Sequence, residues 1–262
     1  MTKFLTLLIA VATLLSCDDP SLDRIDPVEI IEPTIYLSQL ASITTQDDMG
    51  IIIQRIVFVY DNNDRIYRIE YTGNLTQTYD LNYGRNNKLV DYTISGSSTS
   101  QQFGLEYLDE SITVSETSPA TSISYTLDID VQNRINRIRS YDLGTLLSDK
   151  RFTYNENSNV TRKNIVDNSG ILSGFEEISY GFLDNPFKDM NDVVRTIFFE
   201  EFVSNSRFAP LELTVVDRTA GVDTVLSTTV FEYSGTDSMI NRNIETTTAG
   251  GTENRLQIFT FR

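Results

Sequence analysis

The sequence predicts an all-β fold, an antiparallel up-and-down meander of about 15 strands. Two observations predict it: apolar and polar residues alternate along most of the chain after residue 50, and turn-forming residues recur at short, regular intervals. Such alternation gives a sheet one apolar face and one face turned toward water. We expect the meander to curl into a closed, or partly open and flattened, barrel, with one short helix in an insertion near residues 188–203.

The clearest alternation runs through residues 123–131, and shorter examples occupy 78–83 and 178–182. Apolar Ile123, Tyr125, Leu127, Ile129 and Val131 are separated there by Ser124, Thr126, Asp128 and Asp130. The frequency of Tyr, Thr, Ile, Val and Phe also favours strands. Residues 34–50 are ambiguous between a strand and a short helix, so the first expected strand begins at residue 51.

A seven-residue frame recurs along the chain. At 60–66 it reads Tyr-Asp-Asn-Asn-Asp-Arg-Ile: an aromatic residue closes a strand, a polar turn follows, and an aliphatic residue opens the next strand. The frame returns at 83–89, 129–135, 154–160 and 233–239, and a basic residue precedes the aliphatic one in the first three copies (Arg65, Lys88, Arg134). A second set of turn residues lies between the frames, at Gly73, Gly96, Pro119, Gly144, Gly170, Gly221 and Gly250. Each repeat is therefore a pair of short strands that buries its face against its neighbours.

Hairpins that follow one another without long crossovers favour a barrel over an immunoglobulin-like sandwich. Closure also removes exposed sheet edges. A membrane-embedded barrel is the structural alternative, since its strands alternate in the same way. Expected strands of about seven residues, shorter than the ~9 to 11 that cross a bilayer, favour a soluble barrel.

The interval between Tyr180 and Tyr233 is too long for one repeat, which indicates an insertion over residues 184–206. Its apolar residues have helical spacing, with Asn191 or Asp192 as the cap. These residues are Met190, Val193, Val194, Ile197, Phe198 and Phe202. We expect a helix of about three turns whose apolar stripe lies over one end of the sheet, either buried or against a partner. A strand pair with Asn205 as its turn is the alternative.

The N-terminus has the pattern of a secretory signal. Lys3 precedes an apolar run from Phe4 to Leu15, too short to span a bilayer. The run ends Leu-Leu-Ser-Cys, which resembles a bacterial lipobox, and the resemblance implies cleavage before Cys17 and a diacylglycerol on its thiol. An ordinary signal followed by an incidental cysteine is the alternative. Residues 1–16 are thus a predicted lipoprotein signal peptide, 17–33 a lipidated, acidic, proline-rich tether, and 34–262 a single β-meander domain.

The acidic residues after Cys17 resemble the surface-export signal of Bacteroidetes lipoproteins. That resemblance implies an outer-membrane, surface-facing protein attached to the membrane through its lipid. In an enterobacterial host, Asp directly after the cysteine would instead indicate retention at the inner membrane. The net charge of −16 argues against a nucleic-acid partner.

Composition excludes several chemistries. The chain has no His, which rules out a Ser-His-Asp triad and a His-ligated metal, and Cys17 is its one cysteine. We predict no cofactor and no metal site.

The Tyr-x-x-Asn-x-basic-aliphatic frame looks like a degenerate form of the YD-type repeats of large bacterial shell proteins. The chain more closely resembles a family of Bacteroidetes lipoproteins with a domain of unknown function described as porin-like. The lipobox, the acidic tether, the Tyr-ending hairpins and the Asp-Asn-Pro-Phe segment at 184–187 carry this resemblance over about residues 35–262. It implies an antiparallel meander curling toward a barrel, with no established activity.

Candidate chemistry is sparse. The oxygen-rich turns 61–64 and 155–157 lack the Gly and final Glu of an EF-hand loop, and we interpret them as hairpin turns. The acid pairs 176–177 and 200–201 could suggest a glycosidase, although adjacent residues on a strand point to opposite faces. Thr224 and Ser238 match a short Bacteroidetes O-glycosylation pattern of Asp, then Ser or Thr, then an apolar residue.

The sequence therefore predicts a non-catalytic binding module for a glycan, a peptide or a partner protein. The alternatives are a carboxylate-dependent, glycosidase-like hydrolase and a membrane-embedded β-barrel. The sequence alone assigns no catalytic or ligand-binding residue.

Overall fold

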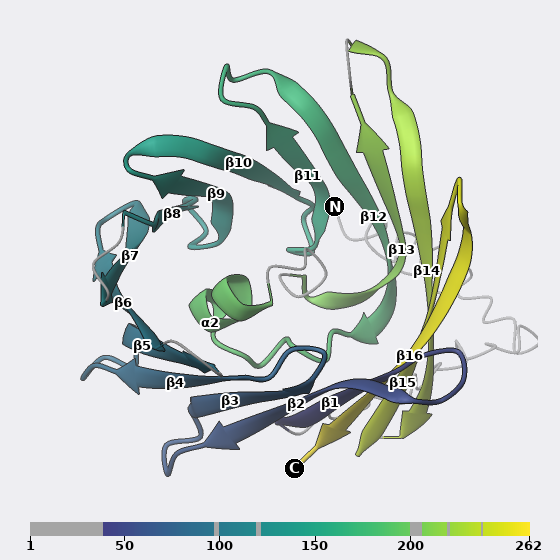
Figure 1. Ribbon diagram of the computed structural model, residues 1–262, viewed down its shortest axis with the longest axis horizontal. Helices are drawn as coiled ribbons and strands as arrows, with labels where there is room; N and C mark the ends of the chain where they lie inside the picture. The colour runs from purple at the N-terminus through teal and green to yellow at the C-terminus, as the bar shows by residue number, and fades with distance from the viewer. Residues whose placement is uncertain (1–38, 97–99, 119–121, 200–205, 219–220, 237) are drawn as a thin grey trace, which may run out of the picture. The chain divides into compact units, whose positions relative to one another are not determined.

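The computed structural model describes residues 39–96, 100–118, 122–199, 206–218, 221–236 and 238–262. Within the compact unit Ile35–Arg262, sixteen antiparallel strands form a closed barrel, in which each strand pairs with its sequence neighbours and β1 pairs with β16 (Figure 1). The predicted fold class, a closed up-and-down barrel with one short helix, is confirmed.

The first eight strands are β1 (Leu40–Gln46), β2 (Ile52–Tyr60), β3 (Ile66–Gly73), β4 (Gln77–Tyr83), β5 (Leu89–Gly96), β6 (Ser100–Tyr107), β7 (Ser111–Ser118) and β8 (Ser124–Ile129). The second eight are β9 (Ile135–Asp142), β10 (Thr145–Tyr154), β11 (Val160–Val166), β12 (Leu172–Asp184), β13 (Phe208–Asp217), β14 (Thr224–Thr236), β15 (Met239–Thr248) and β16 (Gly251–Phe261). Helix α2 (Asp192–Phe198) lies between β12 and β13.

The additional strand is β1, which the ambiguous stretch 34–50 provides. Ile43 pairs with Ile56 of β2 on one side and with Phe259 of β16 on the other. This strand closes the ring, and both of its edges are hydrogen-bonded. The expected strand length of about seven residues holds for β11 but was wrong for several other strands of the second half of the barrel: β12 and β14 have 13 residues each, and β16 has 11.

The recurring frame forms a hairpin turn with a residue in the left-handed region. In the first copy, Asp61 Oδ1 accepts hydrogen bonds from the backbone amides of Asn63 (2.8 Å) and Arg65 (3.0 Å), and Asp64 has φ +58°. Asp130 and Asn155 accept the same pair of amide bonds in their own turns. Asp and Asn are favoured here because they cap such turns and tolerate positive φ, which confirms the hairpin-turn interpretation of 61–64 and 155–157.

Consecutive hairpins are joined by a contact that we call the tyrosine link. The Tyr83 hydroxyl donates a hydrogen bond to the carbonyl of Ile66 (2.8 Å), and the Arg65 guanidinium lies 5.0 Å from the centre of the Tyr83 ring. The aliphatic and basic residues of one frame thus hold the tyrosine of the next. Further links join Tyr107 to Leu89 and Lys88, Tyr154 to Ile135 and Arg134, and Tyr60 to Leu40 and Arg262.

The link at Tyr60 joins the two ends of the barrel. Its hydroxyl bonds to the first residue of β1 (2.7 Å), while Arg262, the last residue of the chain, lies over its ring (4.1 Å). Burial raises the pKa of Tyr60 to about 12, opposed by the nearby Arg262 charge. The hydroxyl therefore remains a hydrogen-bond donor throughout the physiological range.

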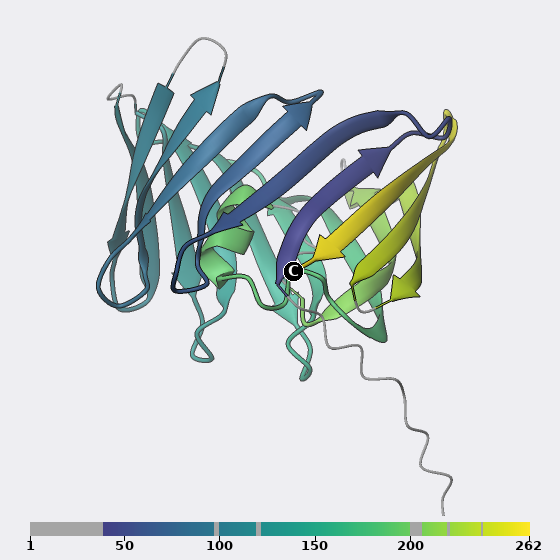
Figure 2. The same ribbon diagram turned by 90° about the horizontal axis from the view of Figure 1, so that it is seen from below.

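The inward side of the barrel wall is apolar around α2, which lies inside the ring of strands (Figures 1 and 2). Buried wall residues come from successive strands and form one cluster with the insertion. They include Ile43, Phe58, Ile69, Leu81, Tyr92, Phe103, Val114, Leu127, Ile138, Phe152, Ile178, Phe231, Ile240 and Phe259. Burial of apolar surface on this scale is the main stabilising term in folding.

The outward side of the wall carries charged pairs between neighbouring strands. Arg68 on β3 contacts Asp80 on β4 at 2.6 Å, with about two fifths of each side chain exposed (41% and 40%). Arg139 contacts Asp128 at 2.6 Å on β9 and β8. Among the described residues, no helix is long and apolar enough to cross a membrane.

Asp149 is the most buried member of these outer charged groups, at 1% exposure. Arg137 donates two hydrogen bonds to its carboxylate, each 2.7 Å, and Arg151 donates another at 2.8 Å. Burial alone would raise the pKa of Asp149, but the bonds from the two arginines outweigh it and lower the pKa to about 2. The carboxylate therefore stays charged between its two cations.

Removal of one tyrosine link should weaken the barrel measurably. We expect Tyr83→Phe to lower the free energy of unfolding by about 1 kcal/mol, because it removes a hydrogen bond and leaves the Ile66 carbonyl without that donor. Urea denaturation measures the difference. Tyr67→Phe, at an exposed position on β3, is the matched control and should change stability by less than about 0.5 kcal/mol. Equal effects for the two variants would contradict a stabilising role for the link.

The Asp149 contacts predict a pH-dependent loss of stability. Because its folded pKa is depressed below the usual 3.8, the stabilisation is present above pH 4 and is lost as the pH falls toward 2. Asp149→Asn should therefore cost about 1–3 kcal/mol at pH 7, and this difference should shrink at pH 2. Asp80→Asn, in a more exposed pair, should cost no more than about 1 kcal/mol. If Asp149→Asn lowered the free energy of unfolding as much at pH 2 as at pH 7, the charged carboxylate would not be the source of the stabilisation.

Candidate ligand-binding site

The insertion between β12 and β13 is held at its base by Asn185. This buried side chain donates through Nδ2 to the carbonyl of Ser206 (2.9 Å), and its Oδ1 accepts from the amide of Phe187 (3.1 Å). The amide of Asn185 also donates to the carbonyl of Arg207 (2.9 Å). These bonds bring the two ends of the insertion together and direct the chain between them into the barrel.

Helix α2 begins at one of the two predicted caps. Asn191 Oδ1 accepts hydrogen bonds from the amides of Val193 (3.0 Å) and Val194 (3.3 Å). The helix has seven residues, about two turns rather than three. Its end is fixed by Phe199, whose amide donates to the carbonyl of Arg195 (3.0 Å).

The insertion does not lie over the end of the sheet as expected; it enters the lumen. Phe187 contacts Phe259 (ring centres 5.9 Å apart), Phe199 contacts Phe58 (5.6 Å), and the rings of Phe187 and Phe199 are 5.0 Å apart. Phe198 lies 4.9 Å from Tyr79 and 5.0 Å from Tyr92. The apolar stripe is therefore buried against the inner wall, because sixteen strands enclose more space than wall side chains fill.

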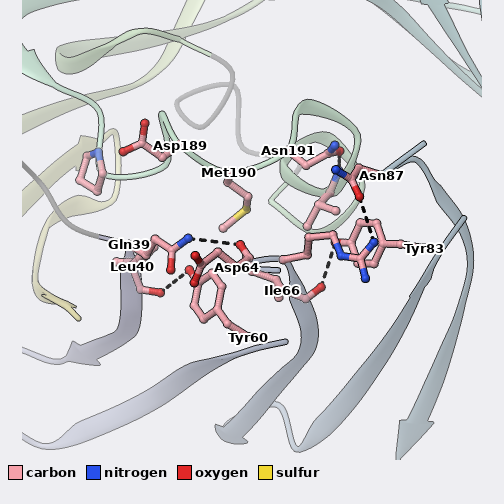
Figure 3. A pocket seen from close by; sticks show the side chains of 13 residues that line it. Gln39, Leu40, Tyr60, Asp64, Ile66, Tyr83, Asn87, Asp189, Met190 and Asn191 are labelled. Atoms are coloured by element: carbon pink, nitrogen blue, oxygen red, sulfur yellow. Dashed lines mark hydrogen bonds between the residues drawn. The ribbon is translucent and has the colours of Figure 1, made fainter. Parts of the chain in front are cut away.

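A first cavity, of about 240 Å³, lies between α2 and the hairpins of β1 to β4 (Figure 3). The tyrosine links of Tyr60 and Tyr83 form one wall, and Asp189, Met190 and Asn191 face them. Two of its charged groups are already paired: Arg65 bonds to Asp61 at 2.6 Å, and Asp64 accepts from Arg262 at 2.9 Å. This cavity is built mainly from groups that hold the barrel together.

A second cavity, of about 280 Å³, lies on the other side of α2 and is rich in cations. Three of them have carboxylate partners: Arg134 with Asp130, Lys188 with Asp184, and Arg195 with Asp192. These pairs reduce the positive charge available to an anionic ligand.

A third cavity, of about 190 Å³, lies inside the lumen against α2. Aromatic side chains from the wall and from α2 dominate its lining, with Tyr92 and Phe103 stacked at 4.9 Å and 11°. The lining residues are Tyr79, Tyr92, Ile94, Phe103, Val114, Tyr125, Leu127, Ile138, Thr196, Ile197 and Phe198. A lining of mainly aromatic and apolar side chains is typical of small-molecule sites, and the volume of this cavity is small for such a site.

A buried carboxylate flanks this luminal cavity. Glu116 is the next inward residue after Val114 on β7 and the Cα partner of Phe103 on β6, and it is 6% exposed. Its Oε1 accepts a hydrogen bond from Gln101 Nε2 (2.9 Å), whereas Oε2 is buried and has no hydrogen-bond partner among the described residues. Burial raises the pKa of both Tyr92 and Tyr125, and the nearby Glu116 charge adds to that rise.

The acid pairs singled out in the sequence do not form a two-carboxylate site where the structure describes them. Glu176 contacts Lys163 at 2.5 Å, while Glu177 contacts Arg162 at 2.8 Å. Each carboxylate has its own cation, consistent with adjacent strand residues on opposite faces. Residues 200 and 201 lie outside the described residues. Groups of three or more Cys, Asp or Glu able to hold a metal ion are absent from the described part of the chain.

Thr224 and Ser238 are both exposed, at the start of β14 and just before β15. Their O-glycosylation stays a prediction. Cys17, the signal peptide and the tether lie outside the described residues, and lipidation likewise stays a prediction.

Sequence reasoning missed Glu116 and the aromatic cavity beside it. The signal was present in β7, where Ile112, Val114 and Glu116 occupy equivalent inward positions of one alternation. An acidic residue in register with an apolar series indicates either a buried charge or the end of the buried face. The distinction needs the neighbouring strands, which bring Phe103 and Gln101 from β6 alongside.

No family model matches the chain, and neither does any curated protein. Among solved structures, a porin-like protein from Bacteroides vulgatus ATCC 8482 is similar with a TM-score of 0.38 and 11% sequence identity, over 86% of this chain and 99% of that chain. Similarity at this level carries no functional argument. The class that the structure itself defines is a closed antiparallel barrel with an internal helical insertion. Membership of the Bacteroidetes lipoprotein family, and kinship with YD repeats, stay predictions.

The contacts of Phe198 make it a test of the buried insertion. Phe198→Ala removes a ring that packs on Tyr79 and Tyr92, so we expect a loss of about 3 kcal/mol in the free energy of unfolding, since truncation of a core Phe leaves a cavity. Chemical denaturation measures it. Phe182→Ala is the control, because Phe182 is 84% exposed. If Phe198→Ala proved as mild as Phe182→Ala, the insertion would not be part of the core.

Proposed function

We propose that this chain is a lipid-anchored envelope protein, attached through Cys17, whose barrel stands in water as a non-catalytic binding module. The observation that carries the proposal is the orientation of the wall: apolar residues cluster inside with α2, and charged pairs lie outside. A membrane barrel needs the reverse arrangement, with an apolar band toward lipid and a polar lumen.

The membrane-embedded alternative is weakened by the outer charges rather than by strand length. Several strands of the second half are long enough to cross a bilayer, since about 9 to 11 residues suffice. Arg68, Asp80, Arg162 and Glu177 nevertheless occupy strand positions that would face lipid. Charges at the bilayer midplane cost roughly 2–4 kcal/mol each for Arg or Lys in such barrels.

The hydrolase alternative has less support than binding. The described carboxylates that sequence singled out are held by lysine or arginine, whereas a glycosidase needs two acids facing one substrate. The filled lumen also favours binding over transport, because Phe187, Val194 and Phe199 are buried within it. A surface-facing position in the outer membrane follows from the lipobox and the acidic tether, and we retain it as part of the proposal.

Solubility distinguishes the water-exposed barrel from the membrane barrel. Residues 18–262, expressed without signal and lipid, should be soluble and folded in detergent-free buffer, with a β-type circular dichroism spectrum and a cooperative thermal transition. A protein that is insoluble in buffer yet folds in detergent micelles would establish the membrane barrel instead.

Labelled palmitate tests the anchor separately. In the full-length protein, Cys17→Ala should abolish incorporation, while Ser16→Ala should retain it. Equal labelling of the two variants would exclude Cys17 as the attachment site. Protease treatment of whole cells then reports whether the barrel faces outward.

A further inference from the structure

We propose that the luminal cavity beside α2 binds a small organic cation, an amine with a single ring or a similarly sized apolar body, whose ammonium group lies against Glu116. The inference rests on the proposed binding function and names the site and the ligand class. Three features support it: the size of the cavity, its aromatic lining, and the unpartnered carboxylate oxygen of Glu116, whose neighbours Phe103 and Val114 line the cavity.

The size of the cavity limits the apolar body of the ligand. Its volume is about 190 Å³, and a cavity of about 150 Å³ with an apolar lining is known to hold a benzene molecule. One six-membered ring with a two-carbon chain is therefore a suitable probe. A glycan or a folded peptide is too large for this enclosure.

The lining favours a flat or compact apolar group near a positive charge. The rings of the lining come from the three consecutive strands β4, β5 and β6 and from β8, and belong to Tyr79, Tyr92, Phe103 and Tyr125. Aromatic faces attract cations as well as apolar groups. The barrel already uses this attraction, for example between Lys88 and the ring of Tyr107 at 4.6 Å.

Glu116 determines the sign of the charge that the ligand must carry. A buried carboxylate is costly unless both oxygens are compensated, and in the described residues only Oε1 is, through Gln101. An ammonium group brings both an opposite charge and hydrogen-bond donors to Oε2. An anionic ligand would be repelled, and a neutral one would leave the carboxylate uncompensated.

The other interior charges do not supply this compensation. Lys163 is held by Glu176 at 2.5 Å on β11 and β12. Arg242 donates to Gln257 on β15 and β16. In the first and second cavities, four cations have carboxylate partners: Arg65, Arg134, Lys188 and Arg195. Of the three cavities that border α2, the luminal one alone has a mainly apolar lining next to a buried carboxylate oxygen without a partner among the described residues, because Phe103 and Val114 line it and Glu116 is their neighbour on the wall.

Three probes of matched shape test the inference by calorimetry: 2-phenylethylamine, which is a cation at pH 7, neutral 2-phenylethanol and anionic phenylacetate. The full-length protein is held in lipid nanodiscs, with protein-free nanodiscs as the blank. We expect the amine to bind at least tenfold more tightly than the alcohol, and phenylacetate to bind more weakly than either. This comparison needs no variant.

Glu116→Gln keeps the shape of the side chain and removes its charge. It should reduce the affinity for 2-phenylethylamine at least tenfold, leave 2-phenylethanol binding unchanged, and raise the melting temperature of the unliganded protein. Glu106→Gln is the matched control: it makes the same chemical change on β6, at an exposed position, and should leave all three affinities unchanged.

Two outcomes would overturn the inference. If the amine and the alcohol bind equally, the cavity takes neutral apolar molecules, and the cation assignment fails while the proposed binding function stands. If no probe binds, the assignment of a ligand to this cavity fails. The proposed function fails on different results, namely a barrel that requires detergent or a palmitate label that does not depend on Cys17.

Discussion

A ring of sixteen strands encloses more space than its own side chains can fill, and most of the interior of this protein follows from that constraint. A barrel of this size must either hold water behind a polar inner wall or take in additional chain. Here the wall is apolar, so an open lumen would expose much of it to water. The insertion between β12 and β13 solves this by placing Phe187, Val194 and Phe199 inside. The cavity that remains beside α2 is a consequence of the same arrangement, because one short helix does not fill the ring completely.

The strands and turns of the wall were largely predictable from the sequence, because residues close together in the chain determine them. The frame Tyr-Asp-Asn-Asn-Asp-Arg-Ile contains a strand end, a turn with a left-handed residue and a strand start, all decided by neighbouring residues. The structure shows why the frame ends in a basic and an aliphatic residue: the guanidinium of Arg65 and the carbonyl of Ile66 contact Tyr83 of the next hairpin. Where the basic residue is replaced, the contact changes accordingly. In the frame at 154–160, Asn159 stands in the position of the basic residue. Its Oδ1 accepts a hydrogen bond from the backbone amide of Phe208 (2.8 Å), and this bond fixes the chain where it returns from the insertion to β13.

The parts that sequence did not determine depend on long-range contacts. Strand β1 was ambiguous because its identity rests on pairing with β16, more than two hundred residues away in the chain. Helix α2 was predicted with its cap, but an apolar stripe fits equally well against a sheet end or within a lumen, and only the size of the closed ring decides. The acid pair at Glu176 and Glu177 was interpreted correctly from strand geometry, whereas Glu116 was overlooked because its neighbours Gln101 and Phe103 belong to another strand.

Charge placement connects the architecture with binding. Outside, carboxylates such as that of Asp149 are satisfied by two arginines and contribute to stability. Inside, Lys163 and Glu176 neutralise one another at 2.5 Å. Glu116 departs from this rule, since one of its oxygens is buried with no partner among the described residues. The closed wall keeps this group in the interior of the barrel, where an unpartnered charge is more costly than in water. The stability that the barrel gains from its tyrosine links and outer ion pairs thus allows an uncompensated charge in the lumen, which is the arrangement that a selective site for a cation requires.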